Sequence, residues 1–417
     1  MAIKYRLTLM NFFQFFIWGS WLITIGNYWF QTKEWSGAEF GVIFSTMGIA
    51  SLFMPAIVGI VADRWVNAEK LYAILHILGG ASLFLIPQIN NPITFFWGIL
   101  LSMVFYMPTI ALANSIAYTA LKNSNCNVVS DYPPIRVWGT VGFIVAMWIV
   151  NLTGNKSSAN QFYIASAVSF LLGVYAFTLP KCPPLAHSEG KKSISKVLGL
   201  DAFGLFKNKK MALFFIFSMC LGAALQLTNA YGDVYLDDFK NIPAYADSFV
   251  IKYSTIIMSI SQISETLFIL AIPFFLKRFG IKNVMLISMF AWVLRFALFG
   301  FGNPVEGLWM IILSCIVYGM AFDFFNISGS LFVETTTDPS MRSSAQGLFM
   351  MMTNGVGAII GSSVSGFVIQ NYFTHNGLKD WHSIWLTFAA YSLIVAVLFA
   401  IFFKHKHEPE KLQIIKH

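Results

Sequence analysis

Residues 308–332 read LWMIILSCIVYGMAFDFFNISGSLF, and this stretch decides the class of protein. Asp323 is the one charged side chain in a run that is otherwise almost entirely apolar or aromatic. A helix needs about 20 apolar residues to cross the hydrocarbon of a bilayer. We therefore expect residues 308–332 to form a transmembrane helix with a single carboxyl group inside it.

The composition of the whole chain also indicates a membrane protein. The chain has 417 residues, of which 57% are hydrophobic and 11% are charged. Soluble domains carry about 25% charged residues, so most of this surface faces lipid rather than water. In a membrane protein, the net charge of +8 is interpreted by where the Lys and Arg residues lie relative to the spans. We therefore expect no nucleic-acid partner.

Further apolar stretches of similar length occur between charged residues and Pro, Gly or Asn breaks. With residues 308–332, the candidate spans are 8–30, 40–62, 71–89, 93–118, 134–151, 161–179, 211–232, 251–276, 283–301, 344–369 and 384–403. The total of twelve puts both termini on one side of the membrane. We expect an all-α membrane protein of 12 transmembrane helices.

The Lys and Arg residues orient this topology. Of the 27 in the chain, few lie in loops on the side opposite the termini, namely Lys33, Lys156, Lys240, Lys252 and Lys379. Cytoplasmic loops carry the excess of Lys and Arg. We therefore place both termini in the cytoplasm.

A polar stretch from Pro180 to Lys210 separates spans six and seven. It predicts an N-terminal half of residues 1–180, a cytoplasmic linker of 181–210 and a C-terminal half of 211–417. The halves echo each other weakly, because GIVADRW ends span two as PFFLKRF ends span eight. Transporters that work by alternating access use duplicated halves with a substrate site near the midplane.

Polar side chains recur at helical spacing inside spans seven and eight. Gln226 and Asn229 lie on one face of span seven, and Gln262 and Glu265 have the same spacing in span eight. Four hydrogen-bonding side chains at two helix midpoints favour a polar cavity. The alternative is that these groups hold helices together across an interface.

Span ten places Asp323 among aromatic residues that include Tyr318 and Phe322. Ionisable groups inside membranes are expensive and mark ion pathways. We interpret Asp323 as the proton-coupling carboxylate, with Glu265 as the second candidate. The alternative is a structural aspartate that is permanently paired.

Arg136, Thr140 and Phe143 form one stripe on span five after Pro133-Pro134. Arg136 lies near the start of that span, so the alternative to an inward role is a side chain that reaches the headgroups. Arg295 in span nine has no polar companions, and we favour a structural or pairing role for it.

No Gly-rich run carries the Gly-Lys-Ser/Thr of a phosphate loop, so an ion gradient is the expected source of energy. The four cysteines show neither CxxC nor metal-ligand spacing. No Ser/His/Asp or metal set converges. We therefore expect no cofactor, no metal and no enzymatic activity.

Several long runs resemble the nucleoside:proton symporters of the major facilitator superfamily, in the order in which that family carries them. They are QFFIWGSW (14–21), PPIRVWGT (133–140), LGLDAF (198–203), SISQISETLFIL (259–270), YGMAFDFFNISGSLFVE (318–334) and RSSAQGLFMMMTNGVG (342–357). The resemblance covers essentially the whole chain. It implies a monomeric symporter in a bacterial inner membrane that imports nucleosides with protons.

The resemblance also implies which side chains bind the nucleoside. These are Arg136, Thr140, Phe143, Gln226, Asn229, Gln262, Glu265, Tyr318 and Phe322, with Asp323 as a coupling carboxylate. Ala223-Ala224 departs from relatives with a polar or acidic residue there, so a permease specialised for xanthosine stays open. A proton-linked carrier of a sugar, a membrane sensor and a membrane enzyme are the rival functions.

Overall fold

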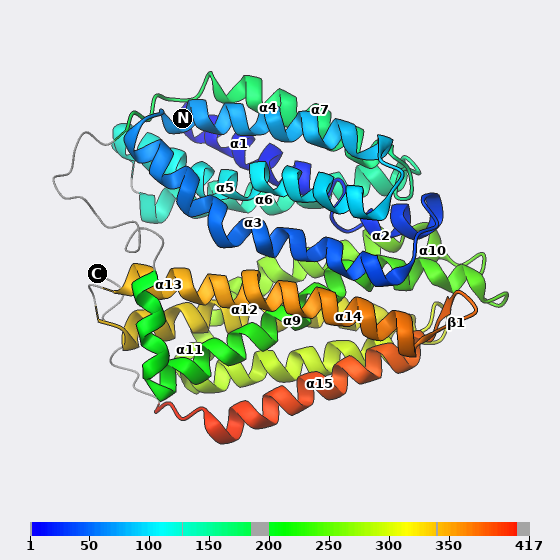
Figure 1. Ribbon diagram of the computed structural model, residues 1–417. Helices are drawn as coiled ribbons and strands as arrows, with labels where there is room; N and C mark the ends of the chain where they lie inside the picture. Colours follow the sequence, from blue (N-terminus) through cyan, green and yellow to red (C-terminus); the bar gives the residue numbers. More distant parts are fainter. Residues whose placement is uncertain (1, 127, 185–199, 339–340, 407–417) are drawn as a thin grey trace. The chain divides into compact units, whose positions relative to one another are not determined.

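The computed structural model describes residues 2–126, 128–184, 200–338 and 341–406 (Figure 1). The chain divides into two compact units, Met1–Ser193 and Ile194–His417. Both units are helical. Half of the predicted linker of residues 181–210, namely 185–199, lies outside the described residues.

Long helices joined by short turns make up the first unit. They are α1 (Ala2–Gly19), α2 (Ile25–Asn27), η1 (Tyr28–Thr32), α3 (Gly37–Arg64), α4 (Ala68–Leu85), η2 (Ile86–Gln88), α5 (Pro92–Asn123), α6 (Val128–Leu152) and α7 (Asn160–Ala176). The predicted span of residues 8–30 is interrupted after Gly19. The Phe16 carbonyl there accepts both the Ser20 backbone N–H at 3.0 Å and the Ser20 hydroxyl at 2.8 Å, and such bonding by serine often bends helices.

The second unit has the same character. It contains η3 (Leu200–Lys207), α9 (Lys209–Asp238), η4 (Phe239–Asn241), α10 (Phe249–Lys252), α11 (Ser254–Phe301), α12 (Leu308–Thr336), α13 (Arg342–Met350), η5 (Met351–Gly357), α14 (Ala358–Tyr372), β1 (Thr374–His375), β2 (Leu378–Lys379) and α15 (Trp381–Phe402). The π-helical segment η5 lies in the middle of the predicted span of residues 344–369.

Helix pairing repeats from one unit to the other. In the first unit α1 contacts α6, α3 contacts α5, and α4 contacts α7. In the second, α9 contacts η5 and α14, and α11 contacts both α12 and α15. In terms of the predicted spans, the first packs on the fifth as the seventh packs on the eleventh. The two units are thus built on one plan.

Glycines set the closest of these helix approaches. A Cβ atom at Gly142 of α6 would collide with the Phe12 carbonyl of α1. A Cβ atom at Gly357 of η5 would collide with the Met219 carbonyl of α9. Small residues let helix backbones approach closely in membranes, so equivalent glycine contacts fix equivalent helix pairs.

The 48-residue helix α11 contains two predicted spans, 251–276 and 283–301. They are separated at Gly280, whose φ of 76° and ψ of 168° are not helical and suit glycine alone. Within the described residues, nine helices are long and apolar enough to cross a membrane. The shorter α1 and α7 have 18 and 17 residues and are not among those nine. Every predicted span therefore lies mainly on helix, with the span of residues 8–30 broken between Gly19 and Ile25.

One small element departs from the all-α expectation. β1 and β2 pair antiparallel, with Thr374 opposite Lys379 and His375 opposite Leu378. The turn residues Asn376 and Gly377 have φ values of 51° and 79°. Asn-Gly with both φ angles positive is typical of a two-residue hairpin turn. The Asn-Gly pair was the sequence signal for this hairpin.

Candidate functional site

Helix α9 carries two of the predicted amides, Gln226 and Asn229. Gln226 is 6% exposed, and its Oε1 accepts no hydrogen bond from any residue that the structure describes. Asn229 is half-buried. A buried acceptor without a partner costs about 1–3 kcal/mol, so Gln226 offers an unfilled position to a ligand that can donate.

Helix α11, which contains the next predicted span, repeats this arrangement. Gln262 and Glu265 are half-buried, and the Gln262 Oε1 is a second buried acceptor without a partner in the described chain. The Ser264 hydroxyl, between them, donates to the Ile316 carbonyl of α12. This bond ties the polar part of α11 to the part of α12 that holds the remaining candidates.

Helix α12 adds two aromatic rings and a carboxylate. The rings of Tyr318 and Phe322, one turn apart, are nearly parallel, with centroids 6.1 Å apart and an interplanar angle of 9°. Asp323 is 4% exposed, and its Oδ2 has no hydrogen-bond partner in residues 200–338 or 341–406. Asp323 forms no ion pair with the described residues, so a permanent ion pair of this aspartate is absent from this part of the chain.

Glu265 links the two helices electrostatically. Its charge interacts with both Tyr318 and Asp323. Two carboxyl groups that interact cannot both ionise without cost in a poorly solvated place. The second unit thus carries unpartnered acceptors on α9 and α11 and, on α12, two parallel aromatic rings and a buried carboxyl group.

The first unit holds the other predicted set on α6. The Arg136 guanidinium lies 4.0 Å from the centroid of the Phe15 ring of α1. Phe143 meets Trp18 edge to face at 6.4 Å, while Thr140 is half-buried. Arg136 therefore packs on a ring of α1. The Arg136 side chain is half-buried.

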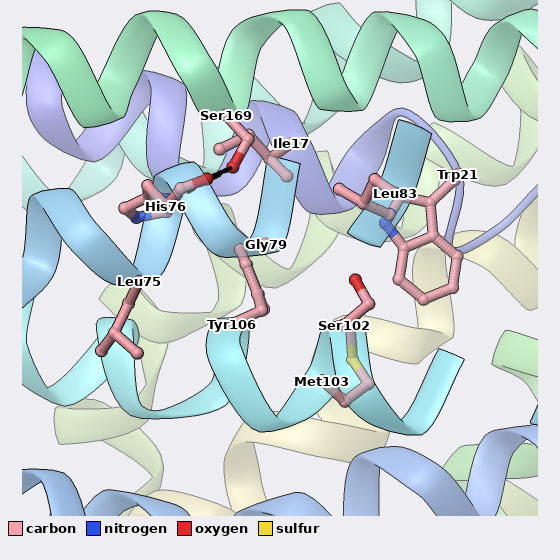
Figure 2. Close-up of a pocket in the computed structure, with 10 residues that line it drawn as sticks. All are labelled: Ile17, Trp21, Leu75, His76, Gly79, Leu83, Ser102, Met103, Tyr106 and Ser169. Carbon is pink, nitrogen blue, oxygen red and sulfur yellow. Dashed lines mark hydrogen bonds between the residues drawn. The ribbon is translucent and has the colours of Figure 1, made fainter. Parts of the chain in front are cut away.

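A buried polar network in the first unit was not predicted. The Gln14 Oε1 accepts from the Tyr72 hydroxyl at 2.6 Å and from the His76 Nε2 at 2.9 Å. The Gln14 amide donates to Thr109 at 2.8 Å. Figure 2 shows the small pocket beside His76, lined also by Ser102. The lone His76 was the one sequence signal, because its partners come from other helices.

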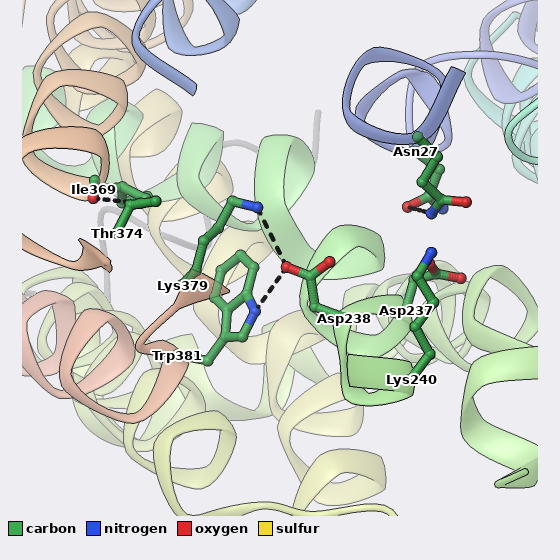
Figure 3. Close-up of polar contacts among 9 residues, drawn as sticks. Asn27, Asp237, Asp238, Lys240, Ile369, Thr374, Lys379 and Trp381 are labelled. Atoms are coloured by element: carbon green, nitrogen blue, oxygen red, sulfur yellow. Dashed lines mark hydrogen bonds and ion pairs between the residues drawn. The ribbon is translucent and has the colours of Figure 1, made fainter. Parts of the chain in front are cut away.

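An ion-pair cluster joins the C-terminal end of α9 to the hairpin (Figure 3). The Lys379 Nζ lies 3.3 Å from the Asp238 Oδ2, with the two side chains 8% and 17% exposed. The Trp381 indole N–H donates to the same oxygen at 3.1 Å. The cluster fastens α9 to the segment that leads into α15.

We expect Lys379→Met to lower the free energy of unfolding by about 1–3 kcal/mol, because it leaves the partly buried Asp238 charge without its cation. The thermal unfolding midpoint of the purified protein in detergent measures the effect. Glu334→Gln is the control, since it weakens the Arg342–Glu334 pair, in which both side chains are 39% exposed. Exposed pairs contribute about 0–1 kcal/mol. Equal shifts of the unfolding midpoint in the two variants would contradict a stabilising role for the Lys379–Asp238 pair.

The fold and the site together define the class of protein. Two helical membrane units share one pairing plan and carry polar side chains inside their spans, as secondary transporters do. The fold is that of the major facilitator superfamily, and a POT family transporter that is 12% identical matches it with a TM-score of 0.72 over 96% of this chain and 95% of that one. The model of the Nucleoside H+ symporter family matches residues 1–408. The chain belongs to this family.

Relatives of known name agree over the full length. The chain is 52% identical over 420 residues to the nucleoside permease NupG of Escherichia coli K12, with all of both chains covered. It is 53% identical over 414 residues to the xanthosine permease of the same organism, with 99% of each covered. The crystal structure of the NupG D323A mutant matches with a TM-score of 0.94 and 53% identity, over 96% of this chain and 100% of that one.

The family assignment confirms the predicted transport class. The chain is a multi-pass membrane protein and a nucleoside–proton symporter rather than an enzyme. A role as a sugar carrier is set aside by the same assignment. Which side chains bind the nucleoside and the proton stays a prediction.

Proposed function

We propose that this protein imports nucleosides together with protons by alternating access and that the C-terminal unit holds the proton-coupling carboxylate and part of the nucleoside site. One observation carries the proposal. Gln226, Gln262 and Asp323, on three different helices, each keep a buried oxygen without a partner among the described residues. Buried polar groups are nearly always hydrogen-bonded, so these three predicted site residues each have an acceptor that a ligand can satisfy.

The chemistry of these groups suits a nucleoside. Amide oxygens accept hydrogen bonds from ribose hydroxyls or from N–H groups at the edge of a base. The parallel rings of Tyr318 and Phe322 offer a flat face, and stacking on aromatic rings tolerates every base. We propose that Asn229 and Glu265 complete the contacts of this unit and that Arg136, Thr140 and Phe143 also bind the nucleoside.

The buried carboxyl groups suit proton coupling. Asp323 forms no ion pair with the described chain, so protonation is the available way to neutralise it inside the membrane. We propose that Asp323 takes a proton from outside, the nucleoside then binds, and release of both to the cytoplasm resets the cycle. Moving one charge through 100 mV is worth about 2.3 kcal/mol, or roughly a fiftyfold gradient of a neutral solute.

Topology follows the distribution of positive charge. We propose that the protein is a monomer in a bacterial inner membrane with both termini in the cytoplasm. The N-terminal half of 1–180, the cytoplasmic linker of 181–210 and the C-terminal half of 211–417 stay the proposed division. The positive-inside rule supports this orientation.

Uptake into proteoliposomes tests the function. We expect radiolabelled uridine and adenosine to accumulate under an imposed inward proton gradient and an uncoupler to abolish the accumulation. Liposomes without protein give the background. Absence of saturable uptake of both nucleosides would overturn the proposal.

Preference for one base is a second question, because the identity to the xanthosine permease equals that to NupG within 1%. Competition of unlabelled xanthosine against labelled uridine decides it. Strong inhibition by xanthosine alone would indicate a specialised permease, while similar inhibition by several nucleosides would indicate a broad one.

A further inference from the structure

Arg295 is the most deeply buried cation of the second unit. It lies on α11 and is 1% exposed. Its guanidinium donates to the Ser314 carbonyl at 2.6 Å and to the Ser261 hydroxyl at 3.4 and 3.5 Å. No carboxylate pairs with it among the described residues, and its Nε has no partner there either. A charge in such a place needs other compensation.

Aromatic rings supply that compensation. The guanidinium carbon lies 4.6 Å from the centroid of the Tyr318 ring and 5.1 Å from that of Phe299. Cations over ring faces at this distance are attracted by the ring quadrupole, most strongly where water is excluded. Arg295 therefore fixes Tyr318 both by direct attraction and by its bond to the Ser314 carbonyl one turn earlier on α12.

Tyr318 has further neighbours that define its orientation. Trp292, one turn before Arg295, meets the ring edge to face at 5.9 Å and 89°. Phe322 is nearly parallel to it. The charges of Glu265 and Asp323 also interact with Tyr318. The ring is thus contacted by Arg295, Trp292 and Phe322.

We propose that Arg295 is a positioning residue of the nucleoside site: it holds the Tyr318 ring, and through it the parallel Phe322 ring, in the plane that stacks on the base. The inference rests on the proposed function, because it requires Tyr318 and Phe322 to contact the nucleoside. It assigns to Arg295 a role in binding rather than in pairing with a carboxylate.

Uridine affinity of the purified full chain, measured by isothermal titration calorimetry, tests the role. We expect Arg295→Met to raise the Kd for uridine about tenfold and Arg295→Lys to raise it by a smaller factor, because lysine keeps the charge without the planar group. The control is Arg278→Met, which removes an exposed arginine of the same helix that lies 5.7 Å from the Phe279 ring. It should leave the Kd unchanged.

A second background separates positioning from a general structural role. In Tyr318→Leu, adding Arg295→Met should change the remaining affinity by less than about twofold, because coupled residues are not additive. A full tenfold further loss in that background would overturn the proposal. Thermal unfolding checks that the variants fold. If Arg295→Met does not fold, wild-type affinity in Arg295→Lys would overturn the proposal.

The outcomes also distinguish the two proposals. If the wild-type chain binds no uridine, the proposed function fails and this inference fails with it. If the wild-type chain binds uridine and Arg295→Met binds it equally well, the inference about Arg295 alone is wrong.

Discussion

Asp323→Asn should abolish the accumulation of uridine against its gradient while leaving exchange of uridine across the membrane intact. Asparagine has the shape of the protonated aspartate but cannot release a proton, so the site can bind and reorient without coupling. The roughly fiftyfold gradient that one proton sustains at 100 mV should fall to equality of the two sides. Uptake and counterflow in proteoliposomes measure the two activities separately.

The matched control is Asp247→Asn, which removes an exposed carboxylate between η4 and α10 and should leave both activities unchanged. Glu265→Gln distinguishes the second candidate. If Glu265 is a nucleoside ligand, its variant should still accumulate uridine, with a raised KM. Accumulation by Asp323→Asn that remains sensitive to an uncoupler would show that another group carries the proton.

The helices could be predicted because a lipid environment strongly constrains the composition of the segments that cross it. A span must be apolar over about 20 residues, and each predicted segment lies mainly on helix for this reason. The interruptions were harder to see. Gly280 ends one helix and starts another, yet glycine is also common inside membrane helices, so its φ could not be known beforehand. The hairpin had a sequence signal in its Asn376-Gly377 pair, but a search for apolar spans does not detect such a turn.

The site could be predicted only in part. Hydropathy placed Tyr318, Phe322 and Asp323 in one span, and polar residues at i, i+3 marked α9 and α11. The spacing of residues within one helix does not show which other helices it contacts. The stacking of Arg136 on Phe15 and that of Arg295 on Tyr318 depend on which helices are neighbours. For the same reason the sequence favoured a structural or pairing role for Arg295 without naming the residues that it contacts.

Gln226→Leu should raise the Kd for uridine about ten- to hundredfold, because the variant leaves a nucleoside donor without its acceptor, at about 1–3 kcal/mol. The same change should not lower the thermal unfolding midpoint. The Gln226 Oε1 has no partner among the described residues, so an apolar side chain removes a cost that the empty site bears. Calorimetry and thermal unfolding on one purified sample measure both effects.

This pair of measurements separates the cavity from an arrangement in which amides hold helices together. Gln346→Leu is the control, because the Gln346 amide donates to the Ser330 carbonyl at 2.8 Å and ties α13 to α12. We expect that variant to lose stability and to keep its affinity for uridine. If Gln226→Leu behaved like Gln346→Leu, Gln226 would be a structural amide, since an interhelical bond of about 0.6–2 kcal/mol would have been lost. The opposite responses of two glutamines in one unit are what a binding site requires, because its polar groups are satisfied by the ligand and not by the protein.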